Sequence, residues 1–228
     1  VQDPEDILNI KSMIKALGSD IPVIAKIEKK RAIELIDAIA SVSDGLMVAR
    51  GDLGVEGDIE KVPGLQRKII DAAVKHAKPV IIATQMLESM IDNPRATLAE
   101  VTDVANGALD GADCLMLSAE VANGKYPVQC VQKMSQIISE VEEWTAAQAR
   151  RYSKDSGVTK DRWEDHEAVA RAVCEAADGL NAKAIVCLTL AGTIARTISQ
   201  WRPRTPVIAI SPRRDVVLLN AGAAFVAA

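Results

Sequence analysis

The chain has 228 residues, of which 49% are apolar, and its net charge is −4 with both signs dispersed. This content suffices to bury the core of one large or two modest domains. The dispersed charge excludes a basic footprint for nucleic acid and a polybasic membrane patch, and the apolar runs are too short to cross a bilayer. The four cysteines lack C-x-x-C spacing, which predicts reduced thiols in a cytoplasmic protein.

Short apolar runs alternate with amphipathic stretches of about a dozen residues, the pattern of βα units around a parallel sheet. The first amphipathic stretch, PEDILNIKSMIKALG (4–18), has a proline near its start, acids in its first turn and a glycine at its end, which predicts a capped helix. Strands are then predicted at 21–28, 44–50, 78–85 and 112–118, and helices at about 30–40, 62–77, 97–109 and 127–148.

The polar segment RRYSKDSGVTKDRWEDH interrupts this pattern and is the best linker candidate. We therefore predict a first domain at 1–146, a linker at 147–163 and a second α/β domain at 164–228. In the second domain, helices are predicted at 164–179, at 192–202 and from about 212, and strands at 182–188, 206–210 and 223–228.

Charged and polar side chains follow the predicted strands of the first domain. Lys26 and Glu28 lie near the end of the apolar run in PVIAKIEKK, and the two-residue period of a strand puts both on one side, with Ile27 on the other. The carboxyl ends of parallel strands meet at one edge, where active groups gather. The residues that the following strands bring to this edge are Asp52, Thr84, Gln85, Ser118 and Glu120.

Two interpretations of these charges are open from the residues alone. Lys26 and Glu28 can form a surface ion pair of little energetic weight, and Asp52 can cap a helix. Alternatively, Glu28 and Asp52 hold a hard divalent cation, Mg²⁺ or Mn²⁺, which prefers oxygen ligands and leaves positions open for a substrate. Lys26 then neutralises negative charge that develops beside the metal.

Four segments resemble consecutive core motifs of pyruvate kinase, in the same order and at similar separations. They are AKIE, DGLMVARGDLGVE, KPVIIATQMLESM and NPRATLAEVTDVANGALDGADCLMLSAEVANGKYP. The resemblance implies an α/β fold: the second half of a (β/α)8 TIM-type barrel, followed by part of a three-layer α/β C-terminal regulatory domain. We therefore expect the natural protein to be longer, because a half barrel leaves a sheet edge and an apolar face uncovered.

The resemblance implies a glycolytic phosphotransferase that converts phosphoenolpyruvate and ADP to pyruvate and ATP. It makes Lys26 and Thr84 the candidate catalytic residues, with Lys26 at the phosphoryl group and the enolate and Thr84 near the face where the enolate is protonated. It assigns Glu28 and Asp52 to Mg²⁺ or Mn²⁺, and it implies K⁺, whose ligands lie outside this sequence. Substrate contacts are expected from the backbone around Ala49, Arg50 and Gly51, which faces the substrate carboxylate, and from Asp52, in addition to Lys26 and Thr84.

In the second domain, TLAGTIARTISQWRP resembles the loop and helix that bind the phosphate of a sugar-phosphate effector. Thr189, Gly192 and Thr193 are the candidate contacts, since hydroxyls and a glycine at a helix N-terminus suit an anion. An ordinary strand-loop-helix turn explains the same residues equally well. The resemblance also implies a homotetramer.

The sequence departs from the family pattern at several positions: Lys29 for Asn, Ala96 and Leu98 for the Pro and Arg of PTRAE, Ala119 and Val121 for the Gly and Thr of SGETA, and Ala191 for Ser. The loss of charge at Leu98 weakens the expectation of a tetramer, and Ala119 restricts the backbone if its φ must be positive. Two other functions stay open: a metal-dependent lyase or aldolase of the phosphoenolpyruvate/pyruvate barrel type, and an inactive regulatory paralogue or fragment.

Overall fold

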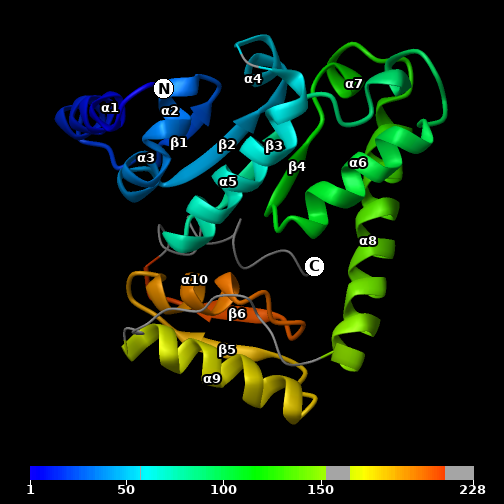
Figure 1. Ribbon diagram of the computed structural model, residues 1–228. Helices are drawn as coiled ribbons and strands as arrows, with labels where there is room; N and C mark the ends of the chain where they lie inside the picture. Colours follow the sequence, from blue (N-terminus) through cyan, green and yellow to red (C-terminus); the bar gives the residue numbers. More distant parts are fainter. Residues whose placement is uncertain (57, 153–164, 214–228) are drawn as a thin grey trace. The chain divides into compact units, whose positions relative to one another are not determined.

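The computed structural model describes residues 1–56, 58–152 and 165–213 (Figure 1). The chain divides into two compact units, Val1–Gln148 and Ala149–Ala228, which are described separately. Within the described residues, no helix is long and apolar enough to cross a membrane.

The first unit is built on a parallel sheet of four strands in the order β1-β2-β3-β4. The strands are β1 (Ile24–Ile27), β2 (Gly45–Ala49), β3 (Val80–Ala83) and β4 (Cys114–Met116). Lys26 lies opposite Met47, and Ala49 opposite Ala83, so the carboxyl ends of β1, β2 and β3 are level with one another. All the strands predicted for this domain are present, each somewhat shorter than predicted.

Helix α1 (Pro4–Ala16) precedes the first strand. The strands are connected by α2 (Lys30–Glu34), α3 (Ile36–Val42), α4 (Arg50–Glu56), α5 (Val62–Lys75) and α6 (Leu98–Leu109), with 3-10 turns η1 (Ile59–Lys61) and η2 (Glu88–Ile91). Helices α7 (Ala119–Ala122) and α8 (Pro127–Tyr152) follow the last strand. The helix predicted at about 30–40 is divided at Leu35 into α2 and α3. Helix α8 continues to Tyr152, inside the segment predicted as a linker, and 153–164 lie outside the described residues. The domain boundaries at 146 and 164 stay predictions.

The core of the first unit lies between one face of the sheet and the helices. Ile27, Val48 and Ile82 lie opposite one another on adjacent strands, share one face of the sheet and are fully buried. They pack with Ile39 of α3 and Ile69 of α5. On the opposite face, the side chain of Ile24 is 48% exposed, so this apolar face of the sheet is only partly covered.

The second unit contains α9 (Asp165–Gly179), β5 (Ile185–Leu188), α10 (Thr193–Gln200) and β6 (Val207–Ile210). Strands β5 and β6 pair in parallel, and α9 packs against α10 around a small core with Ala170 and Ile198. These elements match the predicted ones. Almost all of the helix predicted from about 212, and the whole strand predicted at 223–228, lie outside the described residues.

The turn after α7 requires glycine at position 124. A Cβ at Gly124 would collide with the backbone carbonyl oxygen of Glu120, which cannot rotate away as a side chain could. We expect Gly124→Ala to lower the free energy of unfolding by about 1–3 kcal/mol, measured by urea denaturation. Gly64→Ala is the matched control, because nothing lies within 4 Å of its added Cβ in α5. Equal stability of the two variants would contradict the expected clash.

Candidate active site

The ammonium of Lys26 joins two carboxylates at the carboxyl edge of the sheet. Its Nζ atom lies 2.7 Å from Oε2 of Glu28 and 2.9 Å from Oδ2 of Asp52. Lys26 lies on the side of β1 opposite the buried Ile27, and Glu28, directly after the strand, meets Lys26 there, as the strand period predicts. Asp52 reaches them because β2 pairs directly with β1, and α4, which carries Asp52, begins as soon as β2 ends. The structure therefore brings the three predicted charges together.

Their contacts favour the charged forms of Lys26 and Asp52. The hydrogen bond from Lys26, followed by its charge, holds the pKa of Asp52 below its ordinary value, and the charge of Lys29 adds to this effect. The hydrogen bonds to Glu28 and Asp52 raise the pKa of Lys26. The side chains of Lys26 and Asp52 are 51% and 54% exposed, so a substrate or an ion can reach them. An ion pair this exposed contributes little to folding, so the fold does not need these charges.

Glu28 and Asp52 form a donor set suited to a hard divalent cation. Both are carboxylates, and both contact the same small cationic group, so their oxygens converge on one point. Across the described ranges, no group of three or more His, Cys, Asp or Glu residues could hold a metal ion. Two protein carboxylates, with the remaining ligands from substrate and water, match the way Mg²⁺ usually binds. The donor set fits the expected metal.

Thr84 lies in a strained turn at the end of β3. Thr84 and Gln85 have φ values of +72° and +56°, a left-handed conformation that is rare for a β-branched residue such as threonine. In this conformation, the Oγ1 atom of Thr84 accepts a hydrogen bond from the backbone N–H of Gly51 at 3.1 Å. Two residues that the sequence predicts for the site, one after each of two neighbouring strands, are therefore in direct contact.

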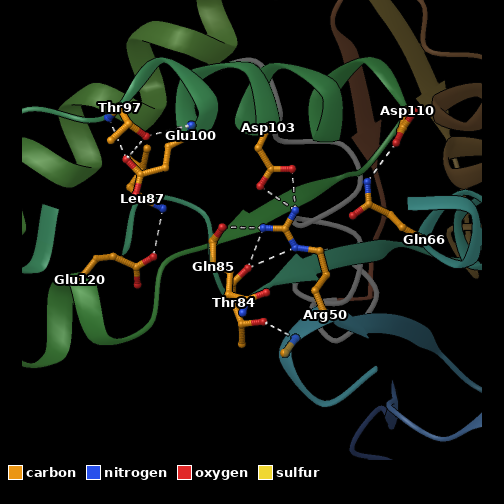
Figure 2. Close-up of polar contacts among 11 residues, drawn as sticks. Arg50, Gln66, Thr84, Gln85, Leu87, Thr97, Glu100, Asp103, Asp110 and Glu120 are labelled. Atoms are coloured by element: carbon orange, nitrogen blue, oxygen red, sulfur yellow. Dashed lines mark hydrogen bonds and ion pairs between the residues drawn. The ribbon is translucent and has the colours of Figure 1, made fainter. Parts of the chain in front are cut away.

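The side chain of Arg50 is turned into the protein (Figure 2). It is 8% exposed, donates to the carbonyl oxygens of Thr84 at 2.7 Å and Gln85 at 2.8 Å, and pairs with Asp103 of α6 at 2.7 Å. The sequence predicted only a backbone contact to substrate around Arg50. Asp103 was not predicted at all, because an acid on an amphipathic helix gives no sign that it meets a buried arginine.

Two further acids lie near this edge, and both have structural partners (Figure 2). Glu120, predicted as an additional acid at the edge, is instead 2% exposed and accepts hydrogen bonds from the backbone N–H groups of Leu87 and Ser118. Burial acts to raise the pKa of Glu100, but hydrogen bonds donated by Ser89 and by its capping partner Thr97 lower it overall. Both carboxylates are therefore held by hydrogen bonds within the protein.

In the second unit, the predicted effector loop forms a tight turn before α10. Gly192 has a φ of +79°, which explains glycine there, and its backbone N–H donates to Oγ1 of Thr189 at 2.8 Å. Thr193 is the first residue of α10. The three residues predicted to bind a phosphate are thus together. The backbone N–H of Gly192, however, already donates its hydrogen bond to the Thr189 hydroxyl.

Comparison with known proteins identifies the family. The family described as pyruvate kinase, barrel domain, matches residues 1–131. The chain belongs to the pyruvate kinase family. The family's second description, pyruvate kinase, alpha/beta domain, matches residues 167–224. The predicted fold class, part of a TIM-type barrel followed by an α/β domain, is confirmed.

Individual pyruvate kinases agree with this assignment. Pyruvate kinase 2 of Synechocystis sp. is 47% identical over 216 residues, which cover 95% of this chain and 35% of that protein. The pyruvate kinase of Thermotoga maritima is 44% identical over 212 residues, covering 93% and 44% of the two chains. The crystal structure of a pyruvate kinase from Cryptosporidium parvum has a TM-score of 0.84 and 39% identity, covering 98% of this chain and 46% of that one. The chain thus spans between about a third and a half of the length of these relatives.

The structure also locates the departures from the pyruvate kinase pattern. Ala119 is the first residue of α7 and is not among the described residues with positive φ, so the predicted backbone restriction does not arise. Leu98 begins α6 with a side chain that is 81% exposed, and Val121 is also exposed. Lys29 precedes α2 and lies near enough to Asp52 for its charge to lower the pKa of that carboxyl.

Proposed function

We propose that the protein containing this chain transfers the phosphoryl group of phosphoenolpyruvate to ADP, with Mg²⁺ or Mn²⁺, and releases pyruvate and ATP. The observation that carries the proposal is the position of the Lys26 ammonium between Glu28 and Asp52, in a chain of the pyruvate kinase family. Phosphoryl transfer depends on positioning and on charge neutralisation more than on covalent catalysis, and this group of side chains supplies both.

In this mechanism each charged group has a separate role. Lys26, whose pKa is raised, donates hydrogen bonds to the oxygens of the transferring phosphoryl group and to the enolate oxygen as negative charge develops there. Glu28 and Asp52 would hold the divalent cation, which when bound would neutralise charge on the phosphoryl oxygens. K⁺ is expected from the family, with ligands in regions outside this sequence.

Thr84 and the start of α4 form the other side of the proposed site. The backbone at Ala49, Arg50 and Gly51 faces the substrate carboxylate, and the Thr84 hydroxyl lies near the face where the enolate is protonated. The contact between the Gly51 amide and Oγ1 of Thr84 supports this arrangement, because it joins the carboxylate side of the site to the protonation side. A substrate carboxylate would share the Gly51 amide with Thr84.

The dependence on ADP tests the proposed function. Full-length protein is incubated with phosphoenolpyruvate and Mg²⁺, with and without ADP, and pyruvate is measured through lactate dehydrogenase. We expect pyruvate only when both ADP and the metal are present. Pyruvate or a cleavage product formed without ADP would instead indicate a lyase, and no turnover under any condition would indicate an inactive paralogue.

Lys29 is expected to weaken metal binding by adding positive charge beside Asp52. Because the effect acts between exposed groups, we expect Lys29→Asn to lower the Mg²⁺ concentration for half-maximal activity by only about threefold at low ionic strength, and less at high salt. Metal-activation curves at two salt concentrations measure this. Lys30→Asn is the matched control, since the charge of Lys30 acts on Asp58. An identical shift in both variants would contradict a specific effect of Lys29.

The second unit is proposed to bind a sugar-phosphate effector through Thr189, Gly192 and Thr193. The support is the left-handed glycine turn directly before α10, which places backbone amides at a helix N-terminus, where anions bind well. A homotetramer in the cytoplasm is proposed from the family alone.

A further inference from the structure

Arg50 is a buried cation whose side chain is fully used inside the protein. Its Nε and Nη2 atoms donate to the carbonyl oxygen of Thr84, Nη2 also donates to that of Gln85, and Nη1 contacts both carboxylate oxygens of Asp103. A guanidinium this buried requires such partners, because an unpaired buried charge is strongly unfavourable. All three side-chain nitrogens of Arg50 therefore have partners within the protein.

The carbonyl groups that Arg50 holds belong to the two left-handed residues after β3. Left-handed backbone is unfavourable for Thr84, which is β-branched, and for Gln85, and such conformations persist only where the surroundings enforce them. The flat, fork-shaped guanidinium contacts both carbonyl oxygens at once. Arg50 therefore holds this turn in a conformation that its own residues disfavour.

The same two segments are joined a second time by the backbone. Gly51, the residue after Arg50, donates its N–H to Oγ1 of Thr84, so the segment after β2 and the turn after β3 hold each other from both sides. Asp103, 53 residues further along the chain than Arg50, fixes the guanidinium from α6 (Figure 2). The contact between Thr84 and Gly51 is thus linked, through the Arg50 side chain, to Asp103 of α6.

We propose that Asp103 is a positioning residue of the active site. By orienting Arg50, it holds the Thr84–Gln85 turn in its left-handed conformation and sets the Thr84 hydroxyl against the Gly51 amide. The proposal rests on the proposed function, in which Thr84 and Gly51 face phosphoenolpyruvate.

The test replaces Asp103 with asparagine in the full-length protein. We expect kcat/KM for phosphoenolpyruvate to fall by about 10- to 100-fold, the loss typical of groups misplaced by up to about 1 Å, while KM for ADP stays unchanged. Arg67→Gln is the matched control: it breaks an arginine-carboxylate contact of 2.8 Å, to Asp110, outside the site. We expect that variant to stay within about twofold of wild type in kcat/KM.

A double-mutant cycle with Thr84→Val separates positioning from a general loss of structure. If Asp103 acts through Thr84, adding Asp103→Asn to Thr84→Val should lower kcat/KM by no more than about threefold further. Gln85→Asn should also restore several-fold activity to Asp103→Asn, because asparagine tolerates left-handed backbone better than glutamine does. Fully multiplicative losses and no rescue would overturn the proposal.

Amide hydrogen exchange supplies a measurement that does not need kinase activity. In Asp103→Asn without substrate, peptides that contain residues 50–56 and 84–86 should exchange faster than in wild type, and those of α5 should not. Unchanged exchange in both segments would overturn the positioning role even if the wild-type protein proved not to be a kinase. If Asp103→Asn does not fold, Asp103→Glu, which keeps the charge but shifts it, should show the same selective loss in kcat/KM; wild-type kinetics in that variant would count against the proposal.

Discussion

Replacing Lys26 with methionine is expected to lower kcat/KM for phosphoenolpyruvate by about 10³-fold or more, because the phosphoryl group and the enolate lose the ammonium that neutralises their developing charge. Methionine keeps most of the length and apolar character of the lysine side chain but carries no charge. Lys26 is half exposed and contacts Glu28 and Asp52 only through its ammonium, so the variant should fold normally. Steady-state kinetics and a thermal unfolding curve measure the two effects separately.

Lys75→Met is the control for this loss. Lys75 is a similarly exposed lysine in α5 and also pairs with an aspartate, Asp37, at 3.0 Å, but it lies outside the proposed site. We expect its kinetics to match wild type within about twofold. Normal turnover in Lys26→Met would refute the role given to this lysine, whatever the result for Lys75→Met.

Asp52→Asn is expected to raise the Mg²⁺ or Mn²⁺ concentration needed for half-maximal activity by at least about 10-fold, because one of two protein ligands loses its charge. Glu28→Gln should have an effect of similar size. High metal concentration should restore part of the activity in either single variant but not in the double variant. Activity measured over a metal titration, with Mn²⁺ binding followed independently by electron paramagnetic resonance, tests this directly.

The pH dependence of metal binding tests whether Lys26 lowers the pKa of Asp52. Lys26 lowers the pKa of Asp52 below its ordinary value of 3.8, so the carboxylate stays ionised as the pH falls toward that value. In Lys26→Met this pKa should rise, and Mn²⁺ binding should weaken at a higher pH than in wild type.

Asp58→Asn is the control for the metal titration of Asp52→Asn, because Asp58 pairs with Lys61 and not with the site. If Asp52→Asn and Asp58→Asn had the same metal dependence, Asp52 would not be a ligand.

Much of the site follows from the period and the pairing of the strands. Alternation along β1 predicts that Lys26 and Glu28 share a side, and parallel order predicts that the end of β2 brings Asp52 to them. The structure confirms both inferences. The family motifs add the identity of the fold, which periodicity alone leaves open between a barrel and an open sheet.

The rest depends on contacts between residues far apart in the sequence. The acceptors of the Arg50 side chain lie 34, 35 and 53 residues away, and no local pattern relates them to it. The left-handed backbone at Thr84 is contrary to the preference of threonine, so the sequence predicts a simple strand end there. Glu120 was expected at the site because it follows β4, but its carboxylate is buried and accepts hydrogen bonds from the backbone amides of Leu87 and Ser118.

The fate of the phosphoryl group tests the central claim most directly. ³¹P nuclear magnetic resonance can follow full-length protein with phosphoenolpyruvate, ADP and Mg²⁺, alongside the Glu28→Gln/Asp52→Asn double variant. We predict that wild type converts the phosphoenolpyruvate signal into the γ-phosphate signal of ATP in equal amount, and that the double variant does not. Loss of phosphoenolpyruvate without growth of the ATP signal, or unchanged ATP formation by the double variant, would contradict the assignment of these residues to phosphoryl transfer.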